Sequence, residues 1–191
     1  MSDTLLSFVL GVIQGLTEFL PISSSAHLLL PSLLFGLNDL GLSFDIAVHA
    51  GTLIAVIYYF RKEIALMFKS FFLSDENLLP HRNLAISLIV ATIPIVLAGL
   101  FVKDLIEQRI FNVEHIAIAN IIFAGILLFA YLKRKDIKNL YSVTLYSALF
   151  VGVFQSLALF PGASRSGTAI TAALLLGFNL KDASKFSFML G

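Results

Sequence analysis

The sequence contains no cysteine, which excludes disulfide bonds, thiol catalysis and thiolate metal ligands. Charged residues are also scarce: they make up 13% of the 191 residues, where a soluble domain has about 25%. The net charge of +1 argues against nucleic acid as a partner. Hydrophobic residues reach 58%, so the composition predicts an integral membrane protein.

The most informative stretch is QGLTEFLPISSSAH at 14–27, which gathers polar residues within an apolar chain. Gln14 and Glu18 are four positions apart and share one face of a helix. Pro21 ends that helix, because proline lacks an N–H and disfavours the helical conformation before it. The three serines that follow can cap a second helix with His27 in its first turn. The stretch predicts two helices separated by a polar break.

A second copy of this pattern follows late in the chain, where GVFQSLALFP at 152–161 resembles GVIQGLTEFLP at 11–21. The identical pairs before any gap are Gly11/Gly152, Val12/Val153, Gln14/Gln155, Leu16/Leu157 and Phe19/Phe160. After a one-residue gap the alignment continues through Pro21/Pro161 and Ser24/Ser164. The chain therefore contains an internal repeat, and PGASRSGT is the partner of PISSSAHL.

The helices around the first break are too short to cross a membrane. Residues 5–16 predict a helix of about 18 Å, against a hydrocarbon core of about 30 Å. Residues 25–35 predict another half-length helix, so the pair forms a re-entrant hairpin; the alternative is one kinked span across 4–20. Residues 141–160 and 164–176 predict a second hairpin.

Full spans are expected at 44–60, 83–102 and 116–132. Lys and Arg set their orientation: loops 61–83 and 133–138 carry four basic residues each, and loop 103–115 carries two. The first two loops are therefore expected in the cytoplasm and the third outside. The hairpins then enter from opposite faces as inverted repeats, and their breaks meet near the midplane.

The predicted fold is a single all-α membrane domain, with a first repeat at about 1–115, a linking helix at 116–132 and the start of a second repeat at 141–191. In the first repeat, two spans follow the position that corresponds to the end of the given sequence. We therefore expect a C-terminally truncated chain. The N-terminal residues 1–3 hold no basic side chain, so a cleaved signal peptide is not expected. The oligomeric state is open, with a homodimer as one alternative.

Glu18 is the first candidate catalytic residue, because a carboxylate in a membrane hairpin is costly and marks function. The alternative is an interfacial glutamate near a helix end. His27 follows Ser24 by three residues, which suits a hydroxyl nucleophile with an imidazole base, or an imidazole that attacks phosphorus itself; a structural histidine is the alternative. Gln14 is assigned to substrate binding, with a helix-packing amide as the alternative.

Arg165 is the other strong candidate, in a glycine- and serine-rich turn that opens a half-helix. Free N–H groups at a helix start favour anions, and a guanidinium can hold a phosphate with two bonds. Gly162 allows close backbone approach, while Ser164 and Ser166 bind the anion or only cap the helix. Ser23, at the other break, completes the predicted substrate-binding set.

Asp45 and His49 are four positions apart in the first span. They either line a cavity shared with the candidate residues of the two breaks or lie at the membrane interface. Two half-helix starts, an arginine, a carboxylate, serines and a histidine are thus expected to converge. The ligand that suits them is a compact polyanion on an apolar carrier, such as a lipid phosphate or diphosphate.

QGLTE, PISSSAH and PGASRSGT together resemble the motifs of the undecaprenyl-diphosphate phosphatase family, also known as bacitracin-resistance proteins. The resemblance covers essentially the whole chain. It implies inverted repeats with two re-entrant hairpins and six spanning helices. It also implies hydrolysis of undecaprenyl diphosphate to the monophosphate at the outer face, which recycles the lipid carrier of cell-wall synthesis. A divalent cation, Mg²⁺ or Ca²⁺, is the implied cofactor.

By position, the resemblance implies Glu18 as the essential acid and metal ligand, and Ser24, His27 and Arg165 as the other catalytic residues. Gln14 occupies the E/Q position of the motif as an amide. The nucleophile is open between Ser24, His27 and water. The alternative function is a transporter or flippase of a polyprenyl phosphate lipid. A structural scaffold is a third option, and it leaves Glu18 and Arg165 unexplained.

Overall fold

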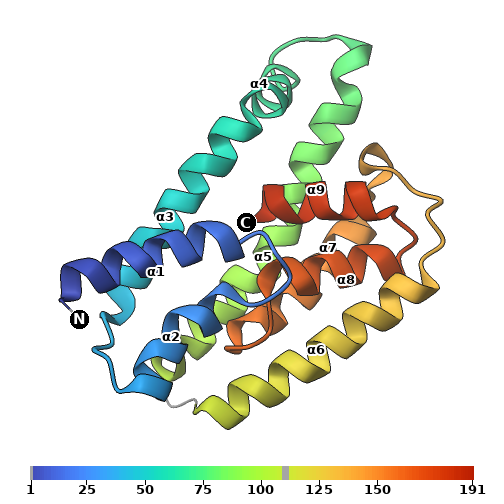
Figure 1. Cartoon of the computed structure of the whole chain (residues 1–191). Coiled ribbons are helices and arrows are strands. Elements are labelled where there is room, and N and C mark those ends of the chain that lie inside the picture. Colours follow the sequence, from blue (N-terminus) through green and yellow to red (C-terminus); the bar gives the residue numbers. More distant parts are fainter. Residues whose placement is uncertain (1, 109–111) are drawn as a thin grey trace.

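A computed structural model describes residues 2–108 and 112–191, and every regular element in that part is a helix (Figure 1). The α-helices are α1 Asp3–Thr17, α2 Ser24–Phe35, α3 Gly41–Tyr59, α4 Arg61–Lys69, α5 Leu79–Glu107, α6 Val113–Lys133, α7 Leu145–Ser156, α8 Arg165–Leu175 and α9 Leu180–Leu190. Short 3-10 helices lie at η1 Glu76–Leu78, η2 Leu140–Ser142 and η3 Leu157–Leu159.

The three predicted spans correspond to α3, α5 and α6. In the described part of the chain, the segments long and apolar enough to cross a membrane are Gly41–Tyr59, Glu76–Asp104 and Val113–Lys133. In the most apolar stretch of each of these helices, only 11% to 17% is buried inside the protein. Most of their surface therefore faces outward, as expected for helices exposed to lipid. The prediction of an all-α membrane protein is confirmed. Arg109, counted above in the loop at 103–115, lies outside the described residues.

Helices α1 and α2 form a hairpin, so the alternative of one kinked span is wrong. Helix α1 ends at Thr17 because Pro21 has no N–H to donate to the Thr17 carbonyl. That carbonyl accepts instead from the Leu20 N–H at 3.2 Å, which tightens the chain into a turn. Helix α2 starts at Ser24 and stops before Gly36, whose φ of +63° favours glycine.

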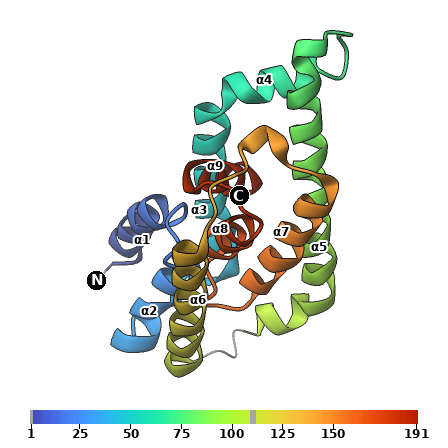
Figure 2. The same cartoon turned by 90° about the vertical axis from the view of Figure 1, so that its right-hand side faces the viewer.

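Helix α7, η3 and α8 form a second hairpin. The two hairpins point toward each other from opposite sides, so that the break of each lies against the other (Figure 1). Helix α5 packs along α7, and α6 packs along α8. Figure 2 shows α4 lying across one end of the molecule, between α3 and α5.

The main core lies between α5, α7, α8 and α9, around buried side chains such as Leu84, Val151, Leu174 and Phe186. The approach of α7 to α5 depends on Gly152. A β carbon on Gly152 would lie 2.3 Å from the Ala91 carbonyl oxygen, which is far inside van der Waals contact. The absence of a side chain at this position therefore sets the distance between the two helices.

Replacing Gly152 with Ala is expected to destabilise the protein, because the backbone of α5 must shift to admit the methyl group. Overpacking of this kind costs about 1–3 kcal/mol, which outweighs the gain of about 1 kcal/mol in helix propensity. Thermal unfolding in detergent should show a lower Tm. Gly11→Ala, at the matching position of the first repeat, is the control, because a β carbon on Gly11 meets no atom within 4 Å. Equal changes in Tm for the two variants would contradict the close α5–α7 contact.

Candidate active site

Glu18 lies at the centre of the candidate site, just after the last turn of α1. It is only 6% exposed. Its Oε2 accepts hydrogen bonds from Gln14 Nε2 at 2.6 Å and from Ser24 Oγ at 2.5 Å. Its Oε1 accepts from Arg165 Nη2. A buried carboxylate needs such partners, and here they come from α1, α2 and α8.

Arg165 reaches Glu18 because the two hairpin breaks lie against each other, as the sequence predicted. The hydroxyl of Ser166 donates to the Leu20 carbonyl at 2.9 Å, which ties the start of α8 to the break after α1. Ser164 is the N-cap of α8, where its Oγ accepts from the Gly167 N–H at 3.1 Å. The cap and the tie fix the first turn of α8, and with it the base of the Arg165 side chain.

Gly162 lies in the turn before α8 with φ +101°, in the region that favours glycine. A β carbon there would lie 2.6 Å from the Ile116 carbonyl oxygen. The close backbone approach predicted at Gly162 is therefore an approach to α6 within the protein.

His27 does not pair with Ser24 among the described residues, although they share the first turn of α2. Its Nδ1 lies 2.8 Å from the Ser23 carbonyl oxygen. A carbonyl only accepts, so Nδ1 carries a proton and Nε2 is left for other partners. The Ser24 hydroxyl donates to Glu18 because an ionised carboxylate is the stronger acceptor. Glu18, rather than His27, is thus placed to take the Ser24 proton.

Ser23 holds the backbone of this break in an unusual conformation. Its φ is +59°, in the left-handed region, and its side chain caps no helix. Ser23 is 2% exposed, and its hydroxyl lies 3.3 Å from that of Ser25. The bond from His27 to the Ser23 carbonyl holds this strained residue in place, as strained residues at functional sites require.

His49 joins the site from α3, which settles one choice that the sequence left open. Its Nε2 lies 3.5 Å from Glu18 Oε2, and its Nδ1 lies 2.7 Å from the Asp45 carbonyl oxygen. The only signal in the sequence was the i, i+4 spacing of Asp45 and His49 within an apolar span. The Glu18 carboxylate at the end of α1 therefore contacts side chains from three other helices: Ser24 of α2, Arg165 of α8 and His49 of α3.

A cavity of about 260 Å³ adjoins the first break, between α2, α3 and η3. Ser25 and Asp45 contribute polar atoms to its wall. Ser25 follows Ser24 in the sequence, and Asp45 lies one helical turn before His49, so both are close to residues that contact Glu18. Leu29, Leu42 and Leu159 contribute apolar surface. A cavity of this mixed character suits a ligand with a polar head and an apolar tail.

Few protein atoms are available to hold a metal ion. No group of three or more His, Cys, Asp or Glu side chains that could do so occurs among the described residues. The oxygen donors at hand are the Glu18 carboxylate and Gln14 Oε1, which is buried and has no hydrogen-bond partner in the described part. Mg²⁺ commonly combines one or two such protein ligands with substrate phosphates, so these residues fit a cation bound together with a phosphorylated ligand.

Comparison with known proteins identifies the family. Residues 7–191 match the family described as bacitracin resistance protein BacA. The chain belongs to the BacA family. An undecaprenyl-diphosphatase of Saccharophagus degradans is 50% identical over 189 residues, which cover 98% of this chain and 71% of that protein. The undecaprenyl-diphosphatase 1 of Pseudoalteromonas translucida is 47% identical over 184 residues, 95% of this chain and 69% of its own length. The resemblance of the motifs to the bacitracin-resistance family is therefore confirmed.

Arg165 offers a test that separates folding from substrate binding. Arg165→Gln leaves the buried Glu18 carboxylate without its cation, so we expect stability to fall by up to about 3 kcal/mol. Arg165→Lys keeps the charge but loses the planar, two-pronged geometry, so its Tm should stay closer to that of the parent while activity is largely lost. Thermal unfolding and phosphate release measured on both variants check this. Near-normal turnover in Arg165→Lys would mean that only the charge matters.

Proposed function

We propose that this chain is an undecaprenyl-diphosphate phosphatase, which hydrolyses undecaprenyl diphosphate to undecaprenyl phosphate and inorganic phosphate. The observation that carries the proposal is the hydrogen bond from the Ser24 hydroxyl to Glu18, beside Arg165, in a chain of the BacA family. Both relatives described above are named undecaprenyl-diphosphatases. The reaction would recycle the lipid carrier of peptidoglycan synthesis and underlie bacitracin resistance.

In the proposed mechanism, Ser24 Oγ attacks the terminal phosphorus and its proton passes to Glu18. The bond to the lipid monophosphate breaks, leaving a phosphoserine. Water then attacks the phosphoserine, its hydroxyl and remaining proton leave with the inorganic phosphate, and Glu18 returns its proton to the Ser24 oxygen as the P–O bond breaks. The N–H groups at the starts of α2 and α8 and the guanidinium of Arg165 stabilise the charge that builds on the phosphate oxygens. His27, in the same turn of α2, is the rival nucleophile.

The proposed cofactor is Mg²⁺ or Ca²⁺, held by Glu18 and the buried Gln14 Oε1 together with the diphosphate. When bound, the ion would neutralise part of the phosphate charge. The support is chemical: both donors are oxygens, they lie one helical turn apart, and Gln14 Oε1 has no other partner in the described part of the chain.

The proposed location is the plasma (inner) membrane, with the site open to the outer, periplasmic side. The support is the excess of Lys and Arg in the loops at 61–83 and 133–138, which is typical of cytoplasmic loops. With this orientation the two hairpins would enter the membrane from opposite faces, and Glu18 and Arg165 would meet at mid-depth.

The purified protein is expected to release inorganic phosphate from undecaprenyl diphosphate. Glu18→Gln removes both the base and the carboxylate ligand, so its kcat should fall by about 10²-fold or more. Excess chelator should abolish the activity of the parent. No phosphate release, combined with movement of the lipid across proteoliposome membranes, would favour a flippase instead. Full activity in chelator would remove the metal from the proposal.

The nucleophile can be identified from the covalent intermediate. If Ser24 attacks, quenching the reaction on substrate labelled in its terminal phosphate should leave label on Ser24 that survives acid. If His27 attacks, the label is lost in acid and survives base. An active Ser24→Ala variant, or label on His27, would refute the serine assignment. No label on either residue would point to direct attack by water.

A further inference from the structure

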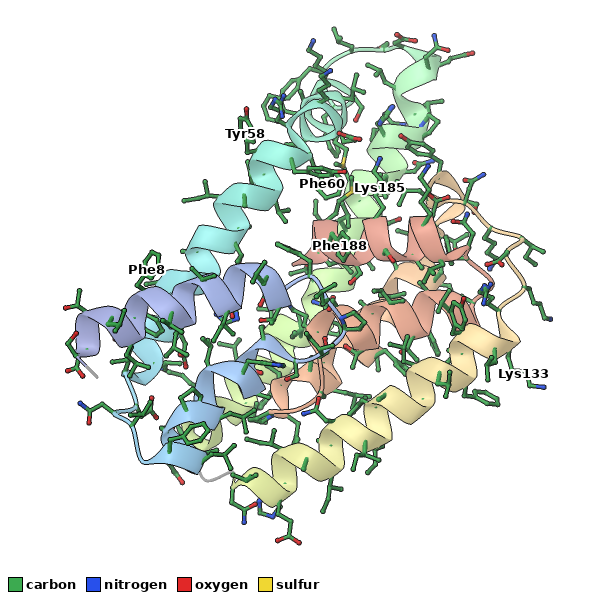
Figure 3. The ribbon with its side chains drawn as sticks, viewed as in Figure 1. Phe8, Tyr58, Phe60, Lys133, Lys185 and Phe188 are labelled. Carbon is green, nitrogen blue, oxygen red and sulfur yellow. The ribbon has the colours of Figure 1, made fainter. Side chains whose placement is uncertain are left out.

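A cavity of about 660 Å³ lies between the junction of α3 with α4 and helix α9. None of the residues that contact Glu18 lines it, and its nearest link to that site is Phe188, whose ring packs on that of Phe19. Figure 3 shows Phe60, Lys185 and Phe188 grouped there, with Lys133 on another side of the molecule. The lining residues are Tyr59, Phe60, Arg61, Lys62, Glu63, Lys181, Ser184, Lys185 and Phe188. Four of these side chains are cationic and one is a carboxylate, so the cavity has an excess of positive charge.

Only one of the four cations is neutralised by the carboxylate. Lys185 Nζ donates to Glu63 Oε1 at 2.9 Å, and this hydrogen bond holds the pKa of Glu63 below its usual range. Arg61 stacks on Tyr58, with its guanidinium carbon 4.4 Å from the ring centroid. Lys62 and Lys181 are exposed and make no ion pair or hydrogen bond within the described ranges. Two ammonium groups therefore remain available to an anion.

The position of the cavity indicates that this anion is attached to a lipid. Helix α3 is apolar enough to span a membrane, and its last turn carries Tyr58 and Tyr59 directly before Arg61 and Lys62. Aromatic rings followed by basic residues mark the level of the lipid headgroups. Phe60, 3% exposed, and Phe188 give the cavity apolar surface next to its charges. Phosphate oxygens and the glycerol end of a lipid would meet matching surfaces there.

We propose that this cavity binds the phosphate headgroup of an anionic phospholipid at the face of the membrane where α3 ends, with Lys62 and Lys181 as its cationic ligands. Its lining residues are not those that contact Glu18, and the binding does not depend on the phosphatase activity. Its occupant would bridge α4 and α9, which the protein itself joins through the Glu63–Lys185 pair.

Lipid binding can be measured directly on the protein purified in neutral detergent, by native mass spectrometry and by the shift in Tm. The probes are phosphatidylglycerol, which is anionic; phosphatidylcholine, which is zwitterionic; and glycerol 3-phosphate, which has no acyl chains. We expect phosphatidylglycerol to bind and to raise Tm, and the other two to do neither at equal concentration. In the Lys62→Gln/Lys181→Gln variant, the apparent affinity for phosphatidylglycerol should fall by about 10- to 30-fold, because each lysine near the membrane surface contributes to the attraction of an anionic lipid.

The matched control is Lys133→Gln/Lys135→Gln, which removes the same charge from exposed positions outside the cavity. Its affinity for phosphatidylglycerol should stay within about threefold of the parent value. Equal losses in the two double variants would overturn the proposal and indicate attraction to the surface as a whole. Equal binding of phosphatidylcholine would overturn the requirement for net charge. Displacement by glycerol 3-phosphate at equal concentration would show a site for soluble phosphates and overturn the lipid assignment.

Discussion

The ion pair between Glu18 and Arg165 is the interaction on which the arrangement of the two hairpins depends. It joins residues 147 positions apart, and its carboxylate is almost completely buried. In an apolar environment either charge alone would be costly, so each hairpin needs the other to neutralise it. The same carboxylate also accepts hydrogen bonds from a hydroxyl and an amide and lies beside an imidazole. Fold and site are therefore stabilised together, and neither hairpin can move away without leaving a buried charge.

Much of this architecture could be predicted from the sequence, because the physical causes are local. Pro21 must end a helix wherever the chain goes afterwards, and a helix of twelve residues cannot span a membrane. Long apolar segments marked α3, α5 and α6 for the same reason. Local patterns do not show which distant segments contact each other, and the internal repeat supplied this information. Two similar breaks in inverted repeats are expected to lie together near the middle of the membrane. That is why the proximity of Glu18 and Arg165 could be predicted without a structure.

The choice of hydrogen-bond partners could not be predicted in the same way. The spacing of Ser24 and His27 shows that they share a helix face, but it does not show which nearby acceptor is stronger. Glu18 comes from another helix, and so does His49, whose approach depends on how α3 packs against α1. Gly162 was assigned to a ligand because glycine permits close approach, yet the group that approaches is the backbone of α6. These outcomes depend on tertiary packing, which no spacing along the chain records.

The sequence repeat also shows how the two halves have diverged. Gln14 and Gln155 match, and in both the buried amide oxygen has no hydrogen-bond partner in the described part of the chain. Glu18, however, aligns with Leu159, and Arg165 aligns with Ser25. In two identical copies related by a two-fold axis, a contact between two different positions occurs twice, once in each direction. Because the copies are joined in one chain and differ in sequence, the charged contact occurs once, between Glu18 and Arg165, while the equivalent positions carry the uncharged Leu159 and Ser25, which line the cavity beside the first break.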